Sequence, residues 1–300
     1  MFSPQRRDGG AVRGGRQAVR NVMTVDVEDY YQVSAFQHLV SRERWSDYES
    51  RVVSNTSRLL DLFAEAKVEA TFFVLGWVAE RHKDLVARIA RNGHQVASHS
   101  YWHRLVYDLS PAEFRDDLRR ARDVLESAAC APVRGFRAPS YSITEESLWA
   151  LDVLIEEGYA YDSSIFPIRH DRYGIPDAPR QPHLVTSKAG SLLEVPSTAG
   201  RVGSLAVPIG GGFFRLFPYR VTRWAIDQIN EGGQPAIFYI HPWEIDPDQP
   251  RLDATLPTRL RHYNNLGQAE DRLRRLLGDF RFGSIESVVL APMAAAGAVA

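Results

Sequence analysis

The 300-residue chain contains one cysteine, Cys130, and this scarcity excludes two kinds of structure. A single thiol forms no intramolecular disulfide and builds no cysteine-based metal cluster. We expect Cys130 to be a small, buried or half-buried residue. An excess of charge of one sign is also lacking, because the formal net charge is −1 and no basic stripe follows the first twenty residues. This balance gives no electrostatic reason to expect a nucleic-acid partner.

Long hydrophobic runs are missing as well. No stretch of 18 consecutive apolar residues occurs, so the sequence predicts no membrane-spanning helix. Residues 1–20 are rich in Arg and Gly and lack the apolar core of a signal peptide, and we expect a disordered extension there. Residues 291–300 are expected to form a frayed tail. No internal repeat is found.

What the chain does have is enough apolar sequence for one large core. Its hydrophobic content is 44%, and helical and strand patterns alternate as an α/β fold requires. The segment 162–209 is the exception and is expected to be poor in strands. Ser110 and Glu113 form a predicted capping box at the start of one helix. Predicted helices are 52–67, 82–92, 111–128, 219–230 and 267–277, and predicted strands are 69–74, 94–97 and 235–240. The count favours an irregular barrel with about seven strands.

Two imidazoles lie four residues apart in Ser98-His99-Ser100-Tyr101-Trp102-His103. Residues at this spacing on a helix or a tight turn lie on one face. His99 and His103 could therefore each offer a ring nitrogen to a Zn²⁺-like cation. The alternative interpretation of the spacing alone is a solvated or hydrogen-bonded pair.

An acidic cluster follows the first strand-like run of the chain. Residues 21–27 are typical of a buried strand, and Asp26, Glu28 and Asp29 come at its C-terminal end. Enzymes built on α/β barrels collect their catalytic groups at this end of the strands. The alternative is an acidic loop that caps the next element.

Three later segments also end a predicted strand with polar groups, namely 134–141, 158–164 and 236–243. Together with the acidic cluster and the histidine pair, this ordered set resembles the five motifs of the polysaccharide deacetylases with a NodB-homology domain, carbohydrate esterase family 4. The resemblance covers most of residues 21–245.

Four strings resemble one branch of that family more closely, the deacetylases that accompany exopolysaccharide and exosortase (PEP-CTERM) gene clusters. They are residues 24–36, 161–167, 210–215 and 241–247. The resemblance implies an α/β fold of the irregular (β/α)7-type barrel class. It also implies a single domain over 21–290, with a C-terminal family extension at about 245–290.

The resemblance further implies a catalytic set for amide hydrolysis. Asp26 would act as the general base, with its carboxylate held by Arg137. His241 would protonate the leaving amine, and Asp162 would raise the pKa of that imidazole. A backbone N–H near Ser140 or Tyr141 would help to stabilise the tetrahedral intermediate.

One departure from the family pattern leaves the metal ligands open. Typical members have two adjacent aspartates, whereas this chain has Asp-Val-Glu-Asp at 26–29. The ligand beside His99 and His103 could be Glu28 or Asp29. Three protein ligands with an open position are expected of a catalytic site. The expected cofactor is one divalent ion, zinc first, with cobalt, nickel or manganese as options.

The segment from about 167 to 217 is expected to form a wall of the substrate groove. Its glycines would let the backbone approach a sugar. Aromatic side chains expected to contact substrate are Tyr141, Tyr173, Phe213, Phe214 and Trp243, although packing in a core is the alternative for such residues.

We therefore predict an enzyme, a hydrolase of linear amide bonds that removes N-acetyl groups from an acetamido-sugar polysaccharide or its lipid-linked precursor during exopolysaccharide biosynthesis. A metal-independent amidohydrolase of the same fold and a non-catalytic glycan-binding protein are the alternatives. The expected partner is the acetylated glycan, with peripheral association with membrane-bound exopolysaccharide machinery. The expected location is the cytoplasm, at the inner face of the cytoplasmic membrane.

Overall fold

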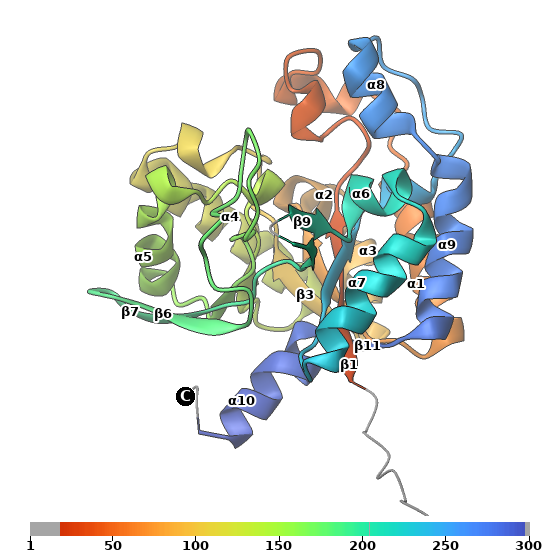
Figure 1. Ribbon diagram of the computed structural model, residues 1–300. Helices are drawn as coiled ribbons and strands as arrows, with labels where there is room; N and C mark the ends of the chain where they lie inside the picture. The colour runs from red at the N-terminus through yellow and green to blue at the C-terminus, as the bar shows by residue number, and fades with distance from the viewer. Residues whose placement is uncertain (1–18, 204, 298–300) are drawn as a thin grey trace, which may run out of the picture.

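The computed structural model describes residues 19–203 and 205–297, and its central feature is a curved sheet (Figure 1). Seven of the described strands run parallel in the order β10-β1-β2-β3-β4-β5-β7. Strand β6 pairs antiparallel with β7, and the short β11 runs parallel to the start of β1. The strands are β1 Arg20–Val27, β2 Thr71–Val74, β3 Gln95–Ser98, β4 Gly135–Phe136, β5 Tyr161–Asp162, β6 His183–Ser187, β7 Gly190–Glu194, β10 Ile237–Ile240 and β11 Arg281–Gly283.

The two ends of the parallel sheet curl towards each other. Val22, Phe73, Ala97, Tyr161, Leu193 and Ile237 come from six different strands and form one buried cluster. Thr198, four residues after β7, donates its N–H to the carbonyl of Ile237 at 3.3 Å and accepts from Ile237 N–H at 2.8 Å. Within the described residues these hydrogen bonds, rather than a strand ladder, join the two ends. The predicted α/β fold with a parallel sheet is confirmed.

Helices cover the outside of the sheet, as amphipathic segments between parallel strands must. The capping box is confirmed, because Glu113 N–H donates to Ser110 Oγ and Ser110 N–H donates to Glu113 Oε2. No helix in the described part of the chain combines the length and apolarity needed to cross a membrane. The helices are α1 Val52–Ala66, α2 Gly76–Arg81, α3 Lys83–Arg91, α4 Pro111–Ala129, α5 Trp149–Glu156, α6 Gly211–Leu216, α7 Tyr219–Glu231, α8 Leu256–Tyr263, α9 Leu266–Asp279 and α10 Ala291–Ala295.

The expectation that 162–209 is poor in strands is wrong. This segment contains β6 and β7, and a second hairpin of β8 Ala199–Val202 and β9 Leu205–Pro208. Residues of β6 alternate between partly buried and exposed, so no continuous apolar run marks the strand. Figure 1 shows the β6–β7 hairpin projecting beside α5, where pairing with its neighbour, rather than deep burial, stabilises β6.

Cys130 differs from the expectation of a buried or half-buried residue, because it is exposed. It ends α4 in the left-handed conformation, with φ 53°, at a helix terminus that faces solvent. Residues 291–295, expected within a frayed tail, form the short helix α10. Arg20, expected in the extension, begins β1. The rest of the expected extension up to residue 18, and the last three residues of the tail, lie outside the described residues.

Gly135 allows β4 and β5 to approach each other. It pairs with Tyr161, and a Cβ atom at this position would overlap the buried Tyr161 ring. We predict that Gly135→Ala lowers the free energy of unfolding by about 2 kcal/mol through overpacking. Gly278→Ala is the matched control, because Gly278 lies in α9 with no neighbouring atom within 4 Å. Urea unfolding of both variants tests this prediction, and equal stability would contradict it.

Candidate active site

The carboxyl ends of the parallel strands meet at one end of the barrel, around a cavity of about 490 Å³. Asp26 and Glu28 come from the end of β1, and His99 follows β3. His103 lies in the next turn, and His241 follows β10. All five side chains line the cavity, so the sequence-predicted acidic cluster and histidines lie together.

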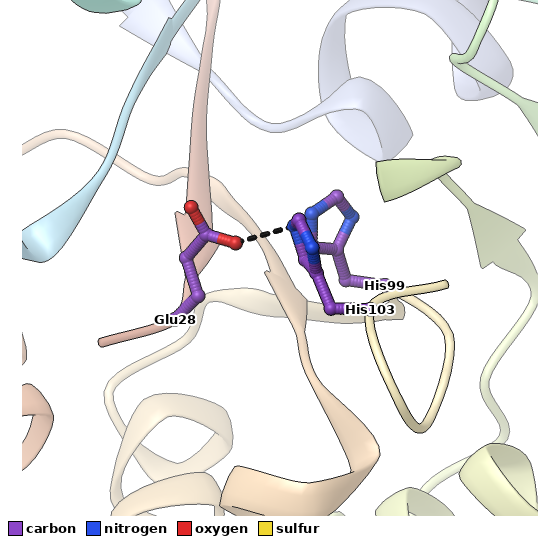
Figure 2. Close-up of side chains that lie close together, drawn as sticks. All are labelled: Glu28, His99 and His103. Carbon is purple, nitrogen blue, oxygen red and sulfur yellow. Dashed lines mark ion pairs between the residues drawn. The ribbon is translucent and has the colours of Figure 1, made fainter. Parts of the chain in front are cut away.

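Glu28, His99 and His103 form a compact cluster of potential ligands. One ligand atom from each lies within 4.8 Å of the others, and all three side chains are buried. Figure 2 shows the Glu28 carboxylate pointing towards the two imidazoles, with His103 Nε2 at 2.6 Å from Glu28 Oε2. Burial alone would raise the pKa of Glu28, but the neighbouring histidines, His103 foremost, lower it to about 2. Burial lowers the pKa of His99 to about 4, which keeps that ring neutral.

The histidine pair is presented by a turn rather than by a helix. Ser100 and His103 have positive φ values of 62° and 50°. Asp117 of α4 holds the turn by accepting the N–H groups of Tyr101 and Trp102. His99 Nδ1 lies 2.8 Å from the carbonyl oxygen of Arg137, so it donates there as N–H and leaves Nε2 as the free ligand atom.

The donor set fits a divalent cation. Two neutral imidazoles and one carboxylate are ligands that zinc accepts. Glu28 Oε2 is buried and makes no hydrogen bond, although the His103 ring nitrogen faces it. Two lone pairs at this distance repel unless a proton or a cation lies between them. The residues present therefore suit an ion held by Glu28, His99 and His103.

Asp29, the alternative ligand, does not reach this cluster. Its carboxylate accepts Ser50 Oγ–H at 2.8 Å and the N–H groups of Arg51 and Val52 at 3.0 and 3.2 Å. Consecutive strand residues point to opposite faces, so Glu28 and Asp29 turn apart just after β1. The structure thus corrects the placement of Asp29 among the metal ligands: it caps the start of α1.

Asp26 and Arg137 form a buried ion pair, as the sequence predicts. Arg137 Nη1 lies 2.7 Å from Asp26 Oδ1 and also donates to Thr24 Oγ1 at 2.8 Å. Its Nη2 donates to Ser163 Oγ at 2.8 Å. The guanidinium is fully buried, so these acceptors orient it and it in turn orients one oxygen of Asp26.

The partner of His241 is Glu244 and not Asp162, which corrects the sequence-based assignment. His241 Nδ1 lies 2.6 Å from Glu244 Oε1, while Nε2 faces Asp26 Oδ2 at 3.9 Å and Glu28 Oε1 at 3.7 Å. Burial lowers the pKa of His241, but the hydrogen bond and charge of Glu244, followed by the other two carboxylates, raise it to about 9. Arg215 Nε completes the arrangement at 2.7 Å from Glu244 Oε2.

Asp162 lies in a different buried network. It pairs in register with Glu194 of β7, and Ser164 Oγ donates to its Oδ1. Burial raises the pKa of Asp162 to about 6, and burial with the charge of Asp162 raises that of Glu194 well above its ordinary value. Burial thus disfavours the charged form of both carboxyls, which lie on the neighbouring strands β5 and β7 and not beside His241.

The predicted substrate-contacting aromatics divide between cavity and core. Tyr141, Tyr173 and Trp243 line the active-site cavity. Phe213 lines a separate cavity, and Phe214 is buried against Phe238, so neither reaches the site. The Trp243 ring already stacks with His241 and His262 inside the protein.

The backbone near Ser140 and Tyr141 is shaped for a close approach. Both residues have positive φ values, 52° and 54°, at the rim of the cavity. Tyr141 N–H already donates to the carbonyl of Ala138 at 3.0 Å, and Ser140 Oγ lies 2.8 Å from Ser34 Oγ. Tyr141 N–H is therefore already engaged within the protein, and a backbone donor at Ser140 N–H stays a prediction.

Sequence reasoning missed Glu244, Arg215 and two further cavity residues, Arg172 and Arg261. A signal for Glu244 is present in His241-Pro-Trp-Glu, because the i,i+3 spacing after Pro forms a capping box that brings the carboxylate back to the imidazole. Arg215 carries no such signal, since it lies 29 residues from Glu244.

Two family descriptions match the chain. Residues 45–157 match the polysaccharide deacetylase family, and residues 163–290 match a domain of unknown function, DUF3473. The first range contains His99, His103 and Arg137, and the second contains His241 and Glu244. The active-site cavity is thus built from both ranges, together with Asp26 and Glu28 before them.

Two of the curated proteins that match this chain are named as deacetylases. A chitooligosaccharide deacetylase of Sinorhizobium fredii is 36% identical over 146 residues, which are 46% of this chain and 63% of that protein. A peptidoglycan-N-acetylglucosamine deacetylase of Bacillus cereus is 33% identical over 98 residues, which are 32% of this chain and 36% of that protein. The chain therefore spans only part of the length of these relatives.

Solved structures share the fold. A structure from Mycobacterium smegmatis described as a polysaccharide deacetylase superposes with a TM-score of 0.64 at 20% identity, covering 94% of this chain and 92% of that chain. A peptidoglycan deacetylase from Bacillus subtilis has a TM-score of 0.50 at 13% identity, with coverage of 93% and 94%. At these identities the likeness shows the fold. Together with the curated relatives and this fold, the family match shows that the chain contains a polysaccharide deacetylase domain, matched over residues 45–157.

Proposed function

We propose that this protein is a metal-dependent hydrolase that removes N-acetyl groups from an acetamido-sugar glycan. The observation that carries the proposal is that the Glu28, His99 and His103 cluster lines one cavity with Asp26 and His241, a carboxylate and an imidazole able to transfer protons. A protein that only binds glycans has no need for this arrangement. The activities named for the curated relatives, on chitooligosaccharide and on peptidoglycan N-acetylglucosamine, support an acetamido sugar as substrate.

Amide hydrolysis needs a base for the attacking water, and Asp26 fits this role. Its Oδ1 is held by Arg137, so Oδ2 is left facing the cavity as the proton acceptor. When bound by Glu28, His99 and His103, a divalent cation supplies Lewis-acid polarisation of the acetyl carbonyl and makes water more acidic. Ser140, which lines the cavity, would donate its N–H to the oxygen on which negative charge develops.

The leaving amine needs a proton, and His241 fits the role of donor. Glu244 fixes Nδ1, so the Nε2–H points towards the space between Asp26 and Glu28. A raised pKa keeps the ring protonated near neutral pH, which a general acid requires. Base and acid are thus separate groups whose roles are set by their ion-pair partners, Arg137 and Glu244.

The proposal also covers the metal ion, the natural substrate and the cellular process. We propose zinc as the ion, on the basis of the His–His–carboxylate donor set, and a polysaccharide or its lipid-linked precursor in exopolysaccharide biosynthesis as the substrate. The PEP-CTERM-type strings at 24–36 and 241–247 support this setting. It would place the protein at the inner face of the cytoplasmic membrane, in peripheral contact with the export machinery.

We predict that a substitution of Glu28 removes the bound metal ion and that a substitution of Asp29 does not. We expect about one zinc ion per chain in the wild type, and loss of that ion with loss of acetate release by about 10³-fold or more in Glu28→Gln and His103→Ala. Asp29→Asn is the control: it should retain the ion, because Asp29 contacts α1 instead of the cluster. Elemental analysis and acetate release from an N-acetylglucosamine oligosaccharide measure these outcomes. Full activity in His103→Ala would refute the proposal.

Turnover is predicted to depend on pH through Glu244. The protonated His241 is the active form, so activity falls as pH rises through the pKa of this ring. Glu244→Gln removes the main group that raises this pKa, so the alkaline limb of kcat should move to lower pH by about one to two units. The measurement is kcat against pH for the metal-loaded protein.

Asp162→Asn is the matched control for this profile. Asp162 contacts Ser164 and Glu194 rather than His241. The alkaline limb of kcat in Asp162→Asn should therefore lie at the same pH as in the wild type. A shift in Asp162→Asn with none in Glu244→Gln would reinstate Asp162 as the partner of the proton donor.

A further inference from the structure

The mouth of the active-site cavity carries two guanidinium groups from distant parts of the chain. Arg172 lies in the loop after β5, and Arg261 lies on α8 near its C-terminal end, and both side chains are exposed and line the cavity. Figure 1 shows α8 at the same end of the molecule as the loops that follow β1. Neither guanidinium takes part in an ion pair within residues 19–203 and 205–297, and the neighbouring Asp171 is an exposed carboxylate with Oδ1 2.9 Å from His170 Nδ1.

Both arginines are held on ordered supports. Buried Arg215 donates to the carbonyl oxygens of Arg261, His262 and Asn264, which fixes the end of α8 over the cavity. On the other side, Arg172 N–H donates to His170 Nδ1 at 3.2 Å. The His170 ring stacks on Tyr173 at 3.8 Å between centroids. The backbone that carries each of the two positive charges is therefore held in place beside the cavity by contacts within the protein.

The charges of Arg172 and Arg261 both influence the stacked rings of His170 and Tyr173. Burial lowers the pKa of His170, and the charges of Arg172 and Arg261 lower it further against the opposite effect of Asp171. The same two arginines act against the burial that raises the pKa of Tyr173 to about 12. Two unpaired cations near one ring repel each other, and an anion between them would relieve that repulsion.

The carboxylates of the cavity do not neutralise this mouth. Asp26 and Glu28 are the acidic residues among its described lining, and both are buried. Asp26 is paired with Arg137, and Glu28 lies against His103. The two guanidinium charges of Arg172 and Arg261, against the one exposed carboxylate of Asp171, leave net positive charge at this mouth.

We propose that the substrate is an anionic acetylated glycan, whose carboxylate or phosphate groups bind Arg172 and Arg261 beside the sugar that loses its acetyl group. Guanidinium forks match both kinds of anion through paired hydrogen bonds. The inference rests on the proposed deacetylase function and narrows its substrate class. The arginines act as specificity-determining residues and take no part in the chemical step.

The test compares three probes that share an acetamido sugar. An oligosaccharide of N-acetylglucosamine is neutral, one of equal length that alternates N-acetylglucosamine with glucuronate carries carboxylates, and UDP-N-acetylglucosamine carries phosphates. We expect the metal-loaded wild type to have a lower KM for at least one anionic probe than for the neutral one, and whichever anion benefits identifies the source. Added salt should remove the preference.

Arg172→Gln combined with Arg261→Gln should raise KM for the favoured anionic probe by about tenfold, with kcat and the neutral probe changed by less than about twofold. Arg259→Gln is the matched control, because Arg259 lies on the same helix, is exposed and does not line the cavity. Equal KM values for all three probes in the wild type, or the same change in Arg259→Gln, would overturn the inference.

Binding of the same probes by calorimetry keeps the two proposals separate. If no probe releases acetate, the deacetylase function fails, and calorimetry still decides whether anionic glycans bind in an Arg172- and Arg261-dependent manner. If the neutral oligosaccharide is deacetylated but anionic probes bind no better than it does, the function stands and the inference on substrate charge is wrong.

Discussion

A single buried guanidinium connects most of the groups on which the active site depends. Arg137 pairs with Asp26 and donates to Thr24 of β1 and to Ser163 after β5, while its own carbonyl accepts from His99. A buried charge requires such complete pairing, because an unpaired one costs several kcal/mol. The same contacts that make Arg137 tolerable in the core thus hold the proposed base and one proposed ligand in register across four strands.

The opposite side of the site has its own buried cation. Arg215 holds Glu244, which holds His241, and the same guanidinium binds the backbone at the end of α8. The proposed proton donor is therefore connected to the end of α8, within the range that matches DUF3473. This connection explains in physical terms how a range without an assigned function completes the cavity of the deacetylase domain.

Residues that end strands could be predicted from the sequence. Asp26, Glu28, His99, Arg137 and His241 each follow an apolar run, and parallel strands bring such ends to one edge. The alternation of helices and strands could also be predicted from the sequence, because strands buried on both faces give continuous apolar segments. The β6–β7 hairpin could not be predicted in this way, since β6 lies at an edge of the sheet and its residues are half exposed.

The sequence by itself determined the α/β fold, the order of the strand-end motifs and the chemical types gathered in the site. Only the tertiary structure decided between Glu28 and Asp29, and between Glu244 and Asp162. Those choices depend on which way a side chain turns at a strand end and on which strands are neighbours, as β5 beside β7 brings Asp162 to Glu194. The spacing of residues along the chain does not show which strands will be neighbours, because contacts between distant segments are set by the packing of the whole sheet.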